Sequence, residues 1–127
     1  MSAPRPGVRT VRRPVLAVVA DAQRRGAAVG VVESVESKSA LLDEFARALD
    51  FPDWVGRNWD ALADALGDLS WLPPGPRVVV WAGADALHAA QPAAYRTALE
   101  VLRDATKRSK DSGRPLTVLL APDPESP

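Results

Sequence analysis

Three aspartates recur at intervals of four residues in the middle of the chain, at Asp60, Asp64 and Asp68. Successive residues of an α-helix are rotated by about 100°, so this spacing predicts one acidic stripe along a helix. The stripe can dock on the cationic surface of another protein, or it can hold a divalent cation. Small residues between the acids would leave the carboxylates prominent and let another surface approach closely: Ala61, Ala63, Ala65 and Gly67.

The opposite face of the same segment is apolar. Trp59, Leu62, Leu66 and Leu69 would lie about 180° from the acidic stripe, so the helix is expected to bury one face. A solvated polar face explains such a pattern equally well, with Asp60 complementing the helix dipole and the other acids conferring solubility. Like charges four residues apart nevertheless repel by about 0.2–0.5 kcal/mol per pair. A docking role that offsets this cost therefore stays open beside the solvated face.

Two tryptophans flank the start of this segment. Trp54 lies in the preceding loop, and an exposed aromatic side chain beside carboxylates is typical of the anchor of a protein interface. Covering the core is an equally good explanation for Trp54, and the sequence leaves both open. Trp59 lies on the apolar face and is expected in the core.

The remaining side chains exclude several kinds of catalytic and metal site. The 127 residues include no cysteine and a single histidine, His88, which rules out disulfides, a thiolate nucleophile, Cys-ligated zinc and a site with two imidazoles. A carboxylate enzyme with a divalent cation on the acidic stripe is the weaker alternative, because an open convex helix face lacks the concave pocket that catalysis usually needs. We therefore expect no enzymatic activity, no metal and no cofactor.

Charge is segregated along a chain whose formal net charge is zero. Residues 1–25 carry six arginines and one aspartate, whereas residues 50–70 carry five aspartates and one arginine, a local charge of −4. Only about six apolar residues follow Arg12 and Arg13, fewer than the roughly 7–15 of an export signal. No apolar run approaches the roughly 18 residues of a membrane span. The composition predicts one cytoplasmic protein without a membrane segment.

Apolar patterning predicts helices and strands that alternate along the chain. Residues 1–13 contain prolines and glycine without apolar periodicity, which predicts a flexible basic arm outside the core. Residues 14–121 are expected to form a single domain, and residues 122–127 a loose tail. Helices are expected over 14–25, from an N-cap at Ser39 to Pro52, from an N-cap at Asn58 to Leu69, and from Pro92 to Lys110; strands are expected over 27–33, 78–81 and 116–120. The last two strands are continuous apolar runs, as in buried parallel sheets.

At residues 51–71 the sequence resembles the barstar family of ribonuclease inhibitors. The matching pattern is Pro52, an aromatic residue at Trp54, Gly56, Asn58, then Asp60-Ala61-Leu62 and Asp64. This is a long spaced signature, and the resemblance extends from about Ala27 to Ala121. It implies an α/β, barstar-like fold with a three-stranded parallel sheet packed against helices. It also implies an intracellular inhibitor that is monomeric when free and binds a secreted barnase-type or toxin ribonuclease in a 1:1 complex.

The resemblance assigns roles to individual residues. Asp64 matches the acid that enters the catalytic cleft, with Asp60 and Trp54 beside it, and Asp104 on the late helix matches another contacting acid. Asp68 is added as the third member of the acidic stripe. A ribonuclease must present a cationic cleft to RNA phosphates, and carboxylates can occupy the places of phosphate oxygens there. These five residues are the expected partner-binding set.

Nucleic-acid binding is the main alternative function. The arginine-rich N-terminus could neutralise phosphates without reading the base sequence. A solubilising tail explains the same arginines, and no interleaved aromatic residues support stacking on bases. The sequence therefore favours an inhibitor over a nucleic-acid-binding protein.

Overall fold

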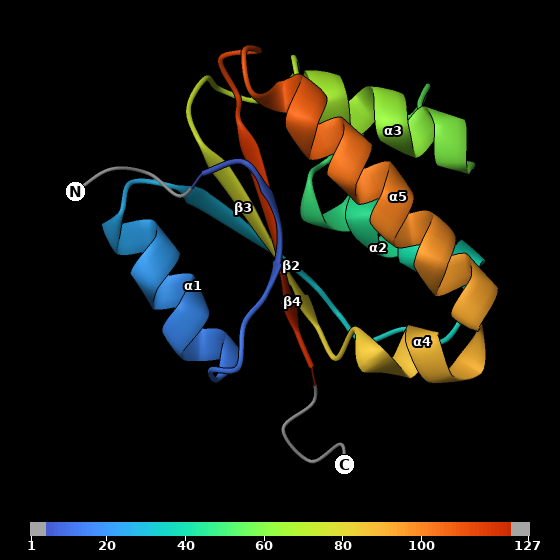
Figure 1. The fold of residues 1–127 in the computed structure, drawn as a ribbon. Coiled ribbons are helices and arrows are strands. Elements are labelled where there is room, and N and C mark those ends of the chain that lie inside the picture. The colour runs from blue at the N-terminus through green and yellow to red at the C-terminus, as the bar shows by residue number, and fades with distance from the viewer. Residues whose placement is uncertain (1–4, 123–127) are drawn as a thin grey trace.

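The computed structural model describes residues 5–122, in which five helices and four strands alternate (Figure 1). The elements in chain order are β1 (Gly7–Thr10), α1 (Val15–Arg24), β2 (Ala28–Val32), α2 (Lys38–Ala48), α3 (Trp59–Asp68), β3 (Arg77–Ala82), α4 (Asp85–Ala90), α5 (Pro92–Ser109) and β4 (Leu116–Ala121). The mixed α/β fold and the parallel sheet confirm the expected fold class.

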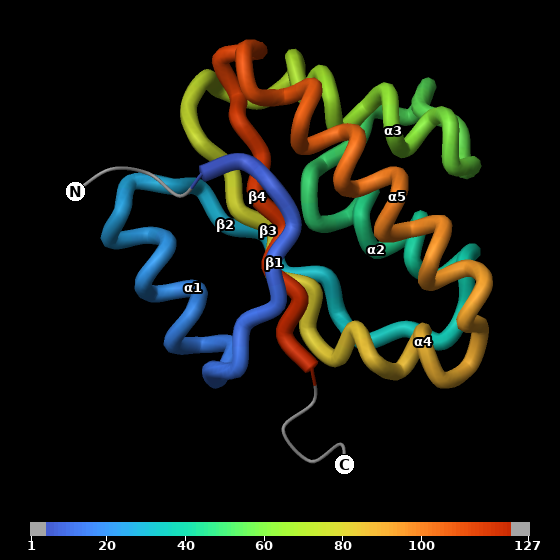
Figure 2. Tube along the Cα trace, viewed as in Figure 1, coloured from blue at the N-terminus to red at the C-terminus, as the bar shows by residue number. Residues whose placement is uncertain are grey.

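The sheet separates two layers of helices. All strand pairs are parallel, in the order β1-β4-β3-β2. Helix α1 covers one face, and the other helices lie on the opposite face (Figures 1 and 2). The chain crosses the sheet in one direction from β1 to β2 and returns stepwise through β3 to β4. Because right-handed crossovers are strongly favoured, connections that run in opposite directions place their helices on opposite faces.

Two apolar cores fill the layers. On the α1 side, Val18 and Ala22 pack with Val78 and Val80 of β3. The larger core lies beneath the other helices and includes the fully buried Trp81, whose ring meets Phe45 edge-on at a centroid distance of 6.3 Å. Strand β3 is thus covered on both faces, which explains its unbroken apolar sequence.

Strand β1 was not expected, because the sequence predicted a three-stranded sheet and a flexible arm over residues 1–13. Residues 7–10 pair with β4, and Gly7 is in register with Thr117. The Thr117 hydroxyl donates to the Arg5 carbonyl at 2.7 Å, and the Val11 amide donates to the Leu120 carbonyl at 2.9 Å. The arm prediction was therefore wrong for these residues, because the unpaired edge of β4 supplies partners that local sequence does not reveal. Residues 1–4 of the predicted arm and 123–127 of the predicted tail lie outside the described residues.

Helix α2 begins earlier than the sequence indicated. Ser37, and not Ser39, is its N-cap: its backbone is extended, and its side-chain oxygen accepts from the Ala40 amide at 3.1 Å. Ser39 lies within the first turn of the helix, so only Ser37 has the extended backbone that a cap requires. The short α4 was not predicted, since it has too few residues to show a helical period.

Two charged side chains of α2, Glu44 and Arg47, form hydrogen bonds with the backbone at the free edge of β2. Glu44 Oε1 accepts from the Glu33 amide at 2.8 Å, and Arg47 Nη2 donates to the Val31 carbonyl at 2.8 Å. Arg47 also bonds both oxygens of Glu44, at 3.0 and 2.9 Å. The hydrogen bond from Arg47, helped by the Glu33 amide, lowers the pKa of Glu44 below its ordinary value, although partial burial opposes this shift.

We predict that Glu44→Gln destabilises the protein at neutral pH and that this difference disappears in acid. A carboxyl group whose pKa is lower in the folded state contributes stability above its unfolded pKa, about 4.3, and this contribution is lost as the pH falls through the folded value. Urea unfolding of both proteins at pH values from 7 to about 3 measures the difference. Glu100→Gln, an exposed substitution on α5, is the control. A Glu44→Gln difference that stays constant over this range would contradict the prediction.

Candidate partner-binding site

Helix α3 is positioned by its cap and its buried face. Asn58 has an extended backbone, and its Oδ1 accepts from the Ala61 amide at 2.8 Å, which confirms the predicted N-cap. Leu62 and Leu66 are buried in the larger core. Leu69 ends the helix in the left-handed conformation, with φ of 52°. Because the buried leucines determine the rotation of the helix, the acidic stripe must face outward.

The structure exposes Asp60, Asp64 and Asp68, as the spacing predicted. The Asp64 side chain is 83% exposed. Asp68 accepts a hydrogen bond from the Ser70 hydroxyl at 2.6 Å, which orients the carboxylate at the end of the helix. These carboxylates contribute little to the core, so their positions are available for binding.

Trp54 projects from the loop before α3 and is 75% exposed. The side chain therefore lies on the surface instead of in the core, and its role as an interface anchor stays a prediction. Its ring meets Trp71 edge-to-face at 6.3 Å. Trp71 is held in turn by a 2.9 Å hydrogen bond from its Nε1 to the Leu49 carbonyl and by an edge-to-face contact with Phe51. Trp54 is thus an exposed aromatic residue that packs against Trp71, a side chain held in place by its own contacts.

Trp59 has a different role from Trp54. It is half-buried and packs against the larger core, which agrees with its expected place on the apolar face. The Lys38 ammonium lies 5.2 Å from its ring centroid. Trp71, assigned by sequence only to a connector, is the aromatic residue that sequence analysis missed.

A cavity of about 300 Å³ lies between α3 and the pair Trp54 and Trp71. Trp54 and Trp71 line it together with Asp64 and Asp68, and small residues such as Ala61 complete the lining. A cationic side chain in this cavity would meet both aromatic rings and carboxylates, which are the two kinds of group that bind guanidinium and ammonium ions most strongly. The predicted residues Asp60 and Asp104 lie outside the lining.

Arg108 of α5 brings two of the predicted acids together. Its Nε lies 3.2 Å from Asp104, its Nη1 lies 3.7 Å from Asp64, and its Nη2 donates to the Ala63 carbonyl at 2.9 Å. The arginine side chain packs over Gly67, where an added Cβ would be in ordinary van der Waals contact with the guanidinium carbon, at 3.5 Å. Arg108 therefore connects α5 to the exposed face of α3.

Sequence analysis assigned no role to Arg108 and therefore missed this contact. The spacing of Asp104 and Arg108, four residues apart, was a usable signal for their pairing. The contact with α3 joins residues far apart in the chain and had no local signal. Both ion pairs are exposed, so they are screened by solvent and leave Asp64 accessible to another cation.

The structure offers no metal centre among residues 5–122, where no group of three or more His, Cys, Asp or Glu side chains could hold an ion. In the same range, no helix is both long and apolar enough to cross a membrane.

We predict that Arg108→Ala lowers the free energy of unfolding by about 0.5–1.5 kcal/mol, because it removes the hydrogen bond between α5 and α3. Chemical denaturation measures the change. Lys107→Ala removes the same charge from the neighbouring position, where the side chain has no hydrogen bond or ion pair to α3 within residues 5–122, and it is expected to change stability by less than about 0.5 kcal/mol. Equal effects of the two substitutions would show that the Arg108 contact is not structural.

Comparison with known proteins identifies a family that this chain matches. The family described as Barstar (barnase inhibitor) matches residues 28–121, about three quarters of the chain. A search of curated proteins finds no matching relative. The matched range begins at β2, ends at β4 and includes the cavity, α3 and Arg108, whereas β1 and α1 precede it. This chain therefore belongs to the barstar family, the family of barnase inhibitors.

Proposed function

We propose that this protein inhibits a barnase-type ribonuclease by laying the exposed face of α3 across the enzyme's cationic active site. The observation that carries the proposal is the cavity in which the exposed Asp64 and Trp54 meet, because it combines charge and aromatic surface within the range that matches the family. Asp60, Asp68 and Asp104 extend the acidic surface around it.

The inhibition follows from the chemistry of the substrate. A ribonuclease binds RNA phosphates with arginine, lysine and histidine side chains, and carboxylates can accept the same hydrogen bonds. An inhibitor that holds Asp64 in the phosphate position therefore competes directly with RNA. Because α3 is already fixed by its cap and its buried leucines, little conformational entropy is lost when the carboxylates bind.

The residues around Asp64 would make the other contacts with the enzyme. Trp54 supplies a large apolar surface and a ring face for a cation of the enzyme, as the tryptophans of many binding hot spots do. Asp60 and Asp104 would contact cations at the border of the cleft. Arg108 holds Asp64 and Asp104 on one surface and limits their mutual repulsion.

The proposal also concerns the biological setting. The complex would contain one inhibitor and one ribonuclease, either a secreted enzyme or a toxin, and would form in the cytoplasm before export. The inhibitor would be monomeric when free, would bind without a cofactor and would catalyse nothing. It would therefore act as an immunity protein or antitoxin.

We predict that Asp64→Ala weakens binding to a barnase-type ribonuclease by about 2 kcal/mol or more, or at least about 30-fold in Kd, because cations of the enzyme would stay buried without a partner. Stability should change by less than about 0.5 kcal/mol, since the side chain is exposed and its ion pair is weak. Inhibition assays and thermal unfolding of the same samples check both expectations.

Two controls separate charge from folding. Asp21→Ala removes an equal charge from α1, on the other side of the sheet, and should not weaken inhibition. Leu62→Ala leaves a cavity in the core and should cost roughly 2–5 kcal/mol of stability. The proposed mechanism is wrong if Asp64→Ala inhibits as strongly as the parent protein, or if it unfolds the chain.

We predict that association with the ribonuclease slows as the salt concentration rises. The chain has no net charge, so the attraction comes from the local −4 segment at residues 50–70. Mobile ions screen attraction beyond about 10 Å at 0.1 M salt. Stopped-flow fluorescence measures the association rate, and a rate independent of salt would contradict electrostatic attraction by this segment.

A further inference from the structure

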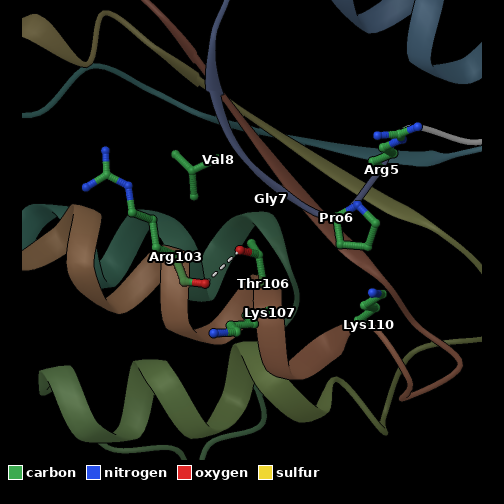
Figure 3. Close-up of a pocket in the computed structure, with 8 residues that line it drawn as sticks. All are labelled: Arg5, Pro6, Gly7, Val8, Arg103, Thr106, Lys107 and Lys110. Carbon is green, nitrogen blue, oxygen red and sulfur yellow. Dashed lines mark hydrogen bonds between the residues drawn. The ribbon is translucent and has the colours of Figure 1, made fainter.

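A second cavity, of about 510 Å³, lies between the first strand and the last helix (Figure 3). One wall consists of residues 5–8, which lead into and begin β1. The other consists of Arg103, Thr106 and Lys107 of α5 and of Lys110, the residue that caps the C-terminal end of this helix. We call this cavity the β1–α5 groove. Its β1 wall precedes the range that matches the family, so the family relationship does not account for the groove.

The lining of the groove contains four cations and no acid: Arg5, Arg103, Lys107 and Lys110. All four are exposed, and none has an ion pair within residues 5–122. Their neighbour Arg108, by contrast, is paired with two aspartates. The four like charges are spread along the groove, with Arg103 and Arg5 at its opposite ends (Figure 3), so the groove is suited to an extended ligand that carries several negative charges.

Arg103 and Lys107 of α5 form one stripe with Lys110, whose backbone at the end of the helix is still helical, because positions 103, 107 and 110 fall within about 60°. Asp104 and Arg108 lie on an adjacent face, which is turned toward α3. One side of the helix therefore serves the proposed ribonuclease-binding face, and the other side lines the groove. A ligand in the groove need not cover Asp64.

The edge of β1 adds backbone donors to the cations. The Val11 amide bonds β4, and amides alternate in direction along a strand, so the Val8 and Thr10 amides point away from β4. Within residues 5–122, no other strand pairs with that edge. The Val8 amide is therefore placed to donate to an anion beside the groove.

We propose that the β1–α5 groove binds the phosphate backbone of single-stranded nucleic acid without reading its bases. Seven residues separate Arg103 from Lys110, a length of about 10 Å along the helix. Every nucleotide carries a phosphate, so consecutive units of a strand present charges to all the cations. The lining has no aromatic residue for stacking on bases. Binding is therefore expected to be independent of sequence and sensitive to salt.

An acidic peptide fits the groove less well. In an extended peptide, alternate side chains face opposite sides, so only half of its carboxylates would face the cations. Pairing of such a peptide with β1 is also limited, because the strand has only four residues and Pro6 before it has no amide hydrogen. The inference goes beyond ribonuclease inhibition and does not depend on it. It also differs from binding by a flexible arginine-rich arm, since Arg5 is the only arginine among residues 1–25 in the lining.

Fluorescence anisotropy with a labelled oligouridylate tests the proposal. The double variant Arg103→Gln, Lys107→Gln should bind about tenfold or more weakly than the full parent chain. Its plot of log affinity against log salt should be shallower by about 0.7 for each phosphate contact removed. Arg96→Gln is the control for the loss of one charge elsewhere on the helix and is compared with the single variant Lys107→Gln, because Arg96 is exposed, two turns from Arg103, and outside the groove. It should bind nearly as the parent does.

The possible results distinguish the ligands. The proposal is supported if only the groove variant loses affinity for oligouridylate and its thermal unfolding is unchanged. Absence of oligouridylate binding by the parent chain would overturn it, as would equal loss in Arg96→Gln. Poly-glutamate that displaces the oligouridylate at a lower concentration of charged groups would also overturn it, in favour of an acidic protein ligand.

Discussion

Burial of the apolar face of α3 is the constraint on which the proposed binding site depends. Leu62 and Leu66 are almost fully buried, and burial of each such side chain stabilises the fold by about 1.5–3 kcal/mol. Rotation of α3 about its axis would expose both leucines, so the direction of the acidic stripe follows from core packing. The carboxylates make no core contacts, and their mutual repulsion is small compared with the burial energy. A stable core can therefore support a surface whose charges are unfavourable in the free protein.

Arg108 connects this surface to the late helix. Its hydrogen bond to the Ala63 carbonyl and its proximity to Asp64 and Asp104 place acids from two helices on one face. The next stripe of α5 carries unpaired cations toward β1. Opposite charges on neighbouring sides of one helix explain how a chain of zero net charge can present both a strongly acidic and a strongly basic surface. Local charge, and not the total, decides which partner each surface attracts.

Features that depend on spacing along the chain could be predicted, and features that depend on distant contacts could not. The α3 stripe and the Asn58 cap follow from residues within one segment. Strand β1 does not, because its four residues have no clear alternation and the edge of β4 determines their conformation. Trp71, which lies beside Trp54, is held by a hydrogen bond from its Nε1 to the Leu49 carbonyl, 22 residues away in the chain. The contact of Arg108 with Ala63 spans 45 residues. The spacing therefore predicted that Asp60, Asp64 and Asp68 are exposed, whereas the two side chains that hold their surroundings in place, Trp71 and Arg108, were not predicted.

Covalent footprinting of the complex with a barnase-type ribonuclease tests the central claim most directly. Carboxylate labelling and tryptophan oxidation, read by mass spectrometry, report the accessibility of each side chain in the free and bound protein. We expect Asp64 and Trp54, both highly exposed in the free chain, to lose reactivity on binding, while Asp21 on α1 keeps its reactivity. Full inhibition of the enzyme with Asp64 and Trp54 still as reactive as in the free protein would show that another surface binds the ribonuclease.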